Sequence, residues 1–177
     1  MVFSVAEAAE LQKEVSSSGG RFINPSKIDG ETRIRLFGEG VTGFEGWTTD
    51  NKPVRWQSRP QELPDNIRKN DDGRDPLKRF VAAIAWEYDT SSFKIISLTQ
   101  KGLIKELMGY IADGENWGDP NGYDIKISRK GEGLQTEYAL KPMPPKSPTK
   151  ESADAFAELS CDLGKLFDNE DPFGEAL

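Results

Sequence analysis

The sequence predicts a mainly β fold with five strands and one helix, followed by an acidic tail. Three observations support this. Five segments have strand character, at 31–47, 79–88, 93–98, 123–129 and 134–141, and in the first part of 31–47 and in the last two segments apolar and polar residues alternate. Between the third and fourth of these, apolar residues recur at helical spacing. Beyond residue 146 the chain is rich in acidic residues, so residues 147–177 are expected to form a largely disordered tail.

The first twenty residues are interpreted as a helical arm and a hinge. Ser4 can cap a helix over 4–15, and Glu7 lies three positions on, as in a capping box. The segment SSSGG at 16–20 has the composition of a flexible connection. A packing or frayed helix is favoured over a partner-binding arm.

The segment at 31–47 is interpreted as one long strand that bends at glycines. Ile34 and Leu36 share one face of it, and the neighbouring arginines lie on the other. Residues 38–43 also match the G-x-G-x-x-G spacing of dinucleotide-binding loops. Those loops open a helix, whereas a strand follows here, so bulge glycines are the preferred interpretation.

The remaining predicted elements are two strands, a helix and a final pair of strands. The strands at 79–88 and 93–98 are joined by a short turn, Thr99 is expected to cap a helix over 99–112, and the last two strands form a hairpin. Five strands, with a long insertion between the first two and a helix after the third, are the element order of an OB-fold. This is a five-stranded Greek-key barrel. The barrel domain would span residues 21–146.

The composition excludes several kinds of chemistry. The 177 residues contain no histidine and one cysteine, Cys161. A Ser-His-Asp or Cys-His nucleophile system, a disulfide and a zinc site of the usual Cys/His kind are therefore excluded. A carboxylate-based nuclease or glycosidase is disfavoured because the acids are scattered over loops. We expect a protein without enzymatic activity, cofactor or metal.

The net charge of −7 would argue against a nucleic-acid partner if it were spread evenly. It is concentrated in the tail, where two lysines and eight acidic residues give −6, which leaves −1 for the rest of the chain. The net charge therefore does not exclude a nucleic-acid partner.

The insertion between the first two predicted strands is the main candidate for a binding site. Its segment 52–59 has three cations, one aromatic residue and no acid. In OB-folds this loop is one of two that bind oligonucleotides, and single strands bind to cations and to aromatic faces on which bases stack. The candidate residues for single-stranded DNA are Trp47, Lys52, Arg55, Trp56, Arg59, Lys78, Arg79, Trp86, Tyr88, Lys126, Arg129 and Lys130. The alternative is that the tryptophans are core residues and that the basic hairpin at 129–133 is only a solvated turn.

Four stretches carry a resemblance to a known family: KIDGETRIR at 27–35, GFEGWT at 43–48, NKPVR at 51–55 and WGDPNGYDI at 117–125. They resemble the single-stranded DNA-binding proteins of tailed bacteriophages. The resemblance implies an OB-fold that coats and protects single-stranded DNA during phage replication, recombination and repair. It also implies a location in the cytoplasm of the bacterial host.

The tail extends this resemblance. Members of the group carry an acidic, aromatic-containing C-terminal tail that recruits replication proteins, and Asp168, Glu170, Asp171 and Phe173 match that pattern. The chain departs from it because four residues follow the aromatic one. The resemblance implies that the tail modulates DNA binding and recruits phage or host replication proteins. Some relatives hold zinc, but a chain with no histidine and one cysteine does not resemble those.

Other functions remain open at this point. The barrel loops could instead bind a protein, as in an adaptor without a nucleic-acid role, or the stacking residues could bind RNA. Self-association on DNA is also left open. No apolar run approaches the roughly 20 residues that span a bilayer, and no signal-peptide pattern is found, so we expect a soluble protein without a membrane partner.

Overall fold

The computed structural model describes residues 4–7 and 21–174. In the first of these ranges, the Ser4 N–H donates to Glu7 Oε2 (2.7 Å) and the Glu7 N–H donates to Ser4 Oγ (3.1 Å). The predicted capping box is thus confirmed. The remainder of the predicted arm and its hinge, at 8–20, lies outside the described residues.

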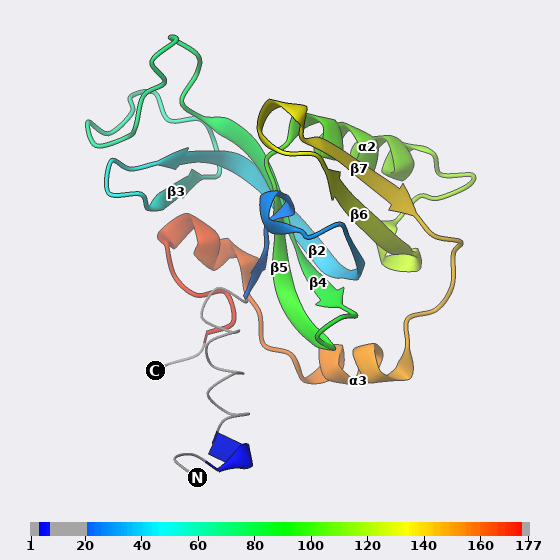
Figure 1. The fold of residues 1–177 in the computed structure, drawn as a ribbon. Helices are drawn as coiled ribbons and strands as arrows, with labels where there is room; N and C mark the ends of the chain where they lie inside the picture. Colours follow the sequence, from blue (N-terminus) through cyan, green and yellow to red (C-terminus); the bar gives the residue numbers. More distant parts are fainter. Residues whose placement is uncertain (1–3, 8–20, 175–177) are drawn as a thin grey trace.

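The described chain forms a mixed, seven-stranded sheet that curls into a half-barrel (Figure 1). The strand order is β1-β5-β4-β2-β6-β7, with β3 paired beside β2, and all pairs are antiparallel except β1 with β5. The strands are β1 (Phe22–Ile23), β2 (Glu31–Trp47), β3 (Pro53–Trp56), β4 (Lys78–Glu87), β5 (Ser92–Leu98), β6 (Asp124–Lys130) and β7 (Glu137–Pro142). The predicted mainly β class is confirmed, and the sheet is compatible with a barrel fold.

The five predicted strands correspond to β2, β4, β5, β6 and β7, whereas β1 and β3 are not predicted. These two strands have two and four residues, too few to show an alternating pattern. The helix α2 (Lys101–Ala112) follows β5 along the chain. Its N-cap is Gln100, which makes no side-chain capping hydrogen bond, so the prediction that Thr99 caps this helix is wrong.

The long strand β2 bends where its register with β4 shifts, between Phe37 and Val41. Gly38 has a φ of +67°, a backbone conformation that residues with a side chain rarely adopt. At Gly40 a Cβ atom would lie 2.8 Å from the carbonyl oxygen of Ala82 on β4. Residues 38–43 are therefore part of a bulged strand, as the sequence predicts.

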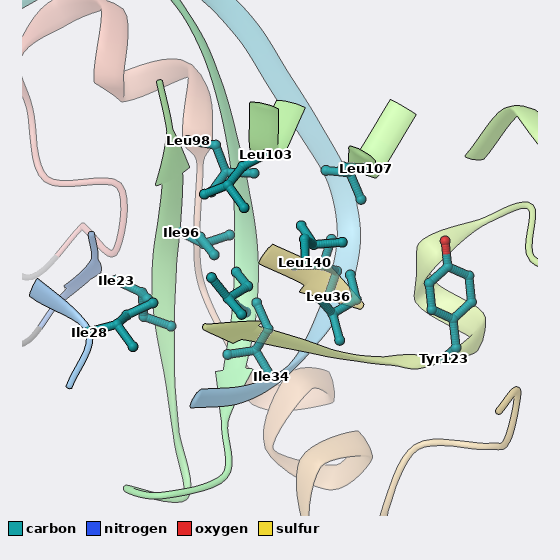
Figure 2. Close-up of a cluster of buried hydrophobic side chains, with 13 residues drawn as sticks. Ile23, Ile28, Ile34, Leu36, Ile96, Leu98, Leu103, Leu107, Tyr123 and Leu140 are labelled. Atoms are coloured by element: carbon teal, nitrogen blue, oxygen red, sulfur yellow. The ribbon is translucent and has the colours of Figure 1, made fainter. Parts of the chain in front are cut away.

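The concave side of the half-barrel holds one hydrophobic cluster (Figure 2). Side chains from β2, β6 and β7 meet there, and two leucines of α2 close it. Its most buried members are Ile34, Ala85, Leu98, Leu103, Tyr123, Ile125, Ile127 and Leu140. Burial of each such aliphatic side chain stabilises the fold by about 1.5–3 kcal/mol.

A second cluster, here called the outer-face cluster, lies on the opposite side of β4 and β5. The sheet contributes Phe37, Phe80, Ala82, Ile84, Trp86 and Ile95, and the C-terminal segment contributes Leu163 and Leu166. Successive residues of β4 alternate between the two clusters, so this strand is buried on both faces.

The C-terminal segment therefore differs from the predicted disordered tail. It contains the helix α3 (Lys150–Glu158) and a 3-10 helix (Leu163–Asp168), shown in orange and red in Figure 1. The ring of Phe156 lies 4.9 Å from that of Phe37, and the ring of Phe167 lies 5.9 Å from that of Phe80. The acidic segment is amphipathic, and its apolar residues as far as Phe173 pack on the sheet.

Candidate nucleic-acid interface

A groove of about 940 Å³ lies between the insertion, the start of β4 and the start of α2. We call it the basic groove because six cations line it: Arg59, Arg74, Lys78, Arg79, Lys101 and Lys105. Asp75 is the one acid, and Phe44 the one aromatic residue, among the described residues that line it. This imbalance of charge makes the groove a candidate site for a polyanion.

Phe44 is presented by the pairing of three strands. It lies directly opposite Trp56 on β3 and Arg79 on β4, so these side chains share one face of the sheet. The Arg79 guanidinium carbon lies 4.6 Å from the centroid of the Phe44 ring, and that of Arg59 lies 5.7 Å from it. Two cations thus flank an aromatic ring at cation–π distance, which provides both stacking surfaces and phosphate partners.

The start of α2 adds to the positive character of the basic groove. Thr99, Gln100 and Lys101 line the groove there. The first turn of this helix has no acidic residue, and no side chain caps it. Its N–H groups and the helix dipole therefore contribute positive potential on this side.

A second groove, of about 700 Å³, lies on the other side of the β2–β3 ribbon, and we call it the tail groove. Arg21, Phe22 and Lys52 line it opposite Glu170 and Asp171 of the C-terminal segment. One carboxylate oxygen of Asp171 lies 3.5 Å from a guanidinium nitrogen of Arg21. One of the acids predicted to bind partners, Asp171, therefore pairs with a cation of the chain itself, and Glu170 lines the same groove.

The sequence-predicted residues of the insertion and its flanks divide between these two grooves. Arg59, Lys78 and Arg79 line the basic groove, whereas Lys52 and Arg55 line the tail groove. The charge of Arg55 is neutralised, because its Nε donates to Glu45 Oε2 at 2.9 Å and both side chains are nearly buried.

Trp47 and Trp56 differ in their exposure. Trp47 ends β2 and is 41% exposed, so a base can reach it. Trp56 is half-buried, and a Cβ atom at Gly46 would lie 3.4 Å from its indole ring. The glycine thus makes room for the indole, which packs on the strand and keeps only part of its surface free.

Trp86 is buried in this structure, contrary to the predicted stacking role, and the Tyr88 ring is engaged by other residues of the chain. Trp86 is 4% exposed and packs edge-on against Phe93, with 5.0 Å between ring centroids. The Tyr88 hydroxyl donates to Asp124 Oδ1 (2.8 Å), and the Arg33 guanidinium lies 4.7 Å from its ring centroid. Burial, together with the hydrogen bond to the carboxylate, raises the pKa of Tyr88 to about 12.

Asp124 is the centre of a buried ion-pair cluster. It accepts hydrogen bonds from Arg33 and Arg35, and Lys146 Nζ lies 3.5 Å from its carboxylate. Arg35 is 1% exposed and also donates to the carbonyl oxygen of Lys146 (2.7 Å). Burial acts to raise the pKa of Asp124, but the hydrogen bonds from the two arginines and from Tyr88 outweigh it and lower this pKa. The cluster links β2, β6 and the chain at Lys146, beyond the end of β7.

The three cations predicted on β6 lie away from the basic groove, since none of them lines it. Lys126 Nζ lies 3.6 Å from a carboxylate oxygen of Glu31, and Arg129 Nε donates to the carbonyl oxygen of Ile28 (2.8 Å). Lys130 is exposed at the end of the strand. Arg129 is thus held in a structural contact, and the two lysines lie on a separate surface.

Four cationic or aromatic residues that line the basic groove are missing from the sequence-predicted set: Phe44, Arg74, Lys101 and Lys105. The i, i+4 spacing of Lys101 and Lys105 indicates that they share one side of a helix. That this side faces the insertion follows only from the tertiary fold.

Among the described residues, no group of three or more His, Cys, Asp or Glu side chains is arranged to hold a metal ion. Nor does any helix within residues 4–7 and 21–174 have the length and apolar character to cross a membrane. Comparisons with protein-family models, with curated proteins and with solved structures give no match to this chain. A functional assignment therefore depends on the groove and its chemistry.

Proposed function

We propose that this chain binds single-stranded DNA without sequence preference, and that the basic groove forms part of the interface. The observation that carries the proposal is that six cations and Phe44 line one groove, and that only two of the cations, Arg59 and Arg74, are paired with an acid among the described residues. Cations that follow the phosphates supply the sequence-independent part of binding, and each stacked base adds roughly 1–3 kcal/mol. No catalytic step is needed for this activity.

The resemblance to phage single-stranded DNA-binding proteins agrees with this proposal. The central strand β2 pairs with β4 on one side and β6 on the other, and α2 lies between β5 and β6 in the chain. These features support an OB-fold, with its helix between the third and fourth barrel strands. Protection of DNA during phage replication, recombination and repair is the role that this resemblance implies.

We further propose that the C-terminal segment competes with DNA. Glu170 and Asp171 line the tail groove opposite Lys52, a cation that would otherwise be free for a phosphate. The same segment covers the outer-face cluster, which includes Trp86. Release of the segment would free both the cation and the aromatic surface for DNA, and would present Phe173 and its neighbouring acids to replication proteins.

The described part of the C-terminal segment lies in the tail groove and not in the basic groove. Residues 166–172 contribute to the tail groove, whereas no described residue beyond Lys105 lines the basic groove. The basic groove is therefore open to DNA while the C-terminal segment is docked. Glu170→Gln combined with Asp171→Asn removes the competing charges, keeps the docked Leu163 and Leu166, and should tighten DNA binding. Deletion of residues 147–177, which also removes these core residues, should abolish the capture of replication proteins.

The test is a titration with oligo-dT at several salt concentrations, in which binding is measured by tryptophan fluorescence and by gel shift. Arg79→Ala should weaken binding and reduce the slope of log K against log salt by about 0.7, the value for one lost phosphate contact on a single strand. Lys69→Ala, which removes an exposed cation of the same insertion outside the groove, is the matched control and should change the slope little.

Absence of binding to oligo-dT at low salt would refute the proposal. An RNA oligonucleotide in the same titration tests the RNA-binding alternative, because stacking surfaces accept either backbone. A chain that binds neither, yet keeps its fold, would instead be consistent with a protein–protein adaptor.

A further inference from the structure

Asp75 stands out because it is an acid within a groove lined by six cations. Its Oδ2 lies 2.7 Å from Arg59 Nη2, and both side chains are about half exposed. Its Oδ1 accepts a hydrogen bond from the backbone N–H of Leu77 at 3.0 Å. A guanidinium and a backbone N–H that converge on one anionic group are the donors that proteins use to bind phosphate.

The positive surroundings of the Asp75 carboxylate are those that a bound phosphate would also need. The pKa of Asp75 is lowered, mainly by the hydrogen bonds from Arg59 and from the Leu77 N–H, and the charge of Lys101 contributes in the same direction. Arg59 belongs to the insertion and Lys101 to the start of α2, so the carboxylate lies under the influence of both sides of the basic groove.

The ion pair also restrains the arginine that flanks Phe44. While Arg59 is paired with Asp75, this guanidinium nitrogen is not free for a DNA phosphate. An exposed ion pair of this kind changes an equilibrium constant by a factor of up to about five. The pair is thus weak enough for DNA to open and strong enough to change the affinity measurably.

We infer that Asp75 occupies, in the free protein, the position that a DNA phosphate takes in the complex, and that DNA binding opens the Arg59–Asp75 ion pair. This inference rests on the proposed function. Asp75 is then a residue that limits the affinity of the basic groove and lets bound DNA leave it.

The experiment measures oligo-dT affinity for the full chain and for Asp75→Asn. Asparagine keeps the oxygen that accepts from the Leu77 N–H and removes the charge, so the loop is expected to keep its conformation. Binding should become about two- to fivefold tighter. The control is Asp71→Asn, which removes the same charge from an exposed position of the same loop that does not line the groove.

A double-mutant cycle separates a local effect from a general effect of charge. In an Arg59→Ala background, Asp75→Asn should tighten binding no more than Asp71→Asn does, because the arginine that the carboxylate would release is gone. Thermal unfolding of each variant, followed by circular dichroism, shows whether the fold is kept.

The outcomes distinguish this inference from the function on which it rests. Wild-type protein that fails to bind oligo-dT overturns the proposed function and the inference with it. Wild-type protein that binds while Asp75→Asn, correctly folded, binds no more tightly than Asp71→Asn overturns the inference alone. An equal gain from Asp75→Asn with and without Arg59 also overturns it.

Discussion

The contribution of the docked C-terminal segment to stability can be tested by Leu166→Ala. Leu166 is 2% exposed and lies in the outer-face cluster with Phe80 and other residues of the sheet. Truncation of a fully buried leucine costs about 2–5 kcal/mol, from lost burial and from the cavity that remains. A loss of about 3 kcal/mol corresponds to a decrease in melting temperature of roughly 6–12 °C for a chain of this size.

The matched control is Leu134→Ala, since Leu134 is fully exposed at the turn between β6 and β7. The same truncation there should change the free energy of unfolding by less than about 0.5 kcal/mol. Urea unfolding followed by circular dichroism gives both values, and limited proteolysis reports whether the segment detaches before the barrel unfolds. If Leu166→Ala matches Leu134→Ala in unfolding and in protease resistance, the docked segment contributes nothing and our argument is refuted.

Three further predictions follow from the site. Asp124→Asn should destabilise the fold by about 3–5 kcal/mol in urea unfolding, because the buried Arg35 loses its charged partner, and a change below about 1 kcal/mol would contradict this. Tyr88 should ionise near pH 12. A pH titration followed by phenolate absorbance should show this step in the wild-type protein and not in Tyr88→Phe. Since its pKa is raised on folding, the stability that it contributes is present below about pH 10 and lost as the pH rises towards 12. Trp47→Phe should reduce the fluorescence change on oligo-dT binding more than Trp86→Phe does while the C-terminal segment is docked, and the reverse order would argue against the exposed position of Trp47.

The sequence contains most of the information for the sheet, and its local patterns explain why. In β2 the alternation of Ile34 and Leu36 with arginines, and the glycines that follow, are enough to predict a long bent strand. In β4 the run from Phe80 to Trp86 is apolar at every position, which is typical of a strand buried on both faces. This apolar run indicates that another segment of the chain covers the outer face of β4. The covering residues, Leu163 and Leu166, are hard to recognise in the sequence because they lie among many acidic residues.

The site is less predictable because charges act through partners that lie elsewhere in the chain. Arg55 looks free for DNA in its local sequence, yet Glu45, ten residues earlier, pairs with it across two strands. Lys101 and Lys105 look like the solvated side of a helix until the fold brings them to the insertion. Register between strands and the packing of a helix on a loop are tertiary properties, so periodicity alone does not contain them.

The outer-face cluster joins residues that leave the ribosome at very different times. Phe37 and Trp86 emerge well before α3 and Leu166, whose contacts they share. At the usual 5–20 residues per second, synthesis of residues 147–177 takes roughly two to six seconds. Until this segment is made and docks, the sheet lacks the cover of its aromatic surface. A chain that ends before α3 would keep this surface uncovered permanently.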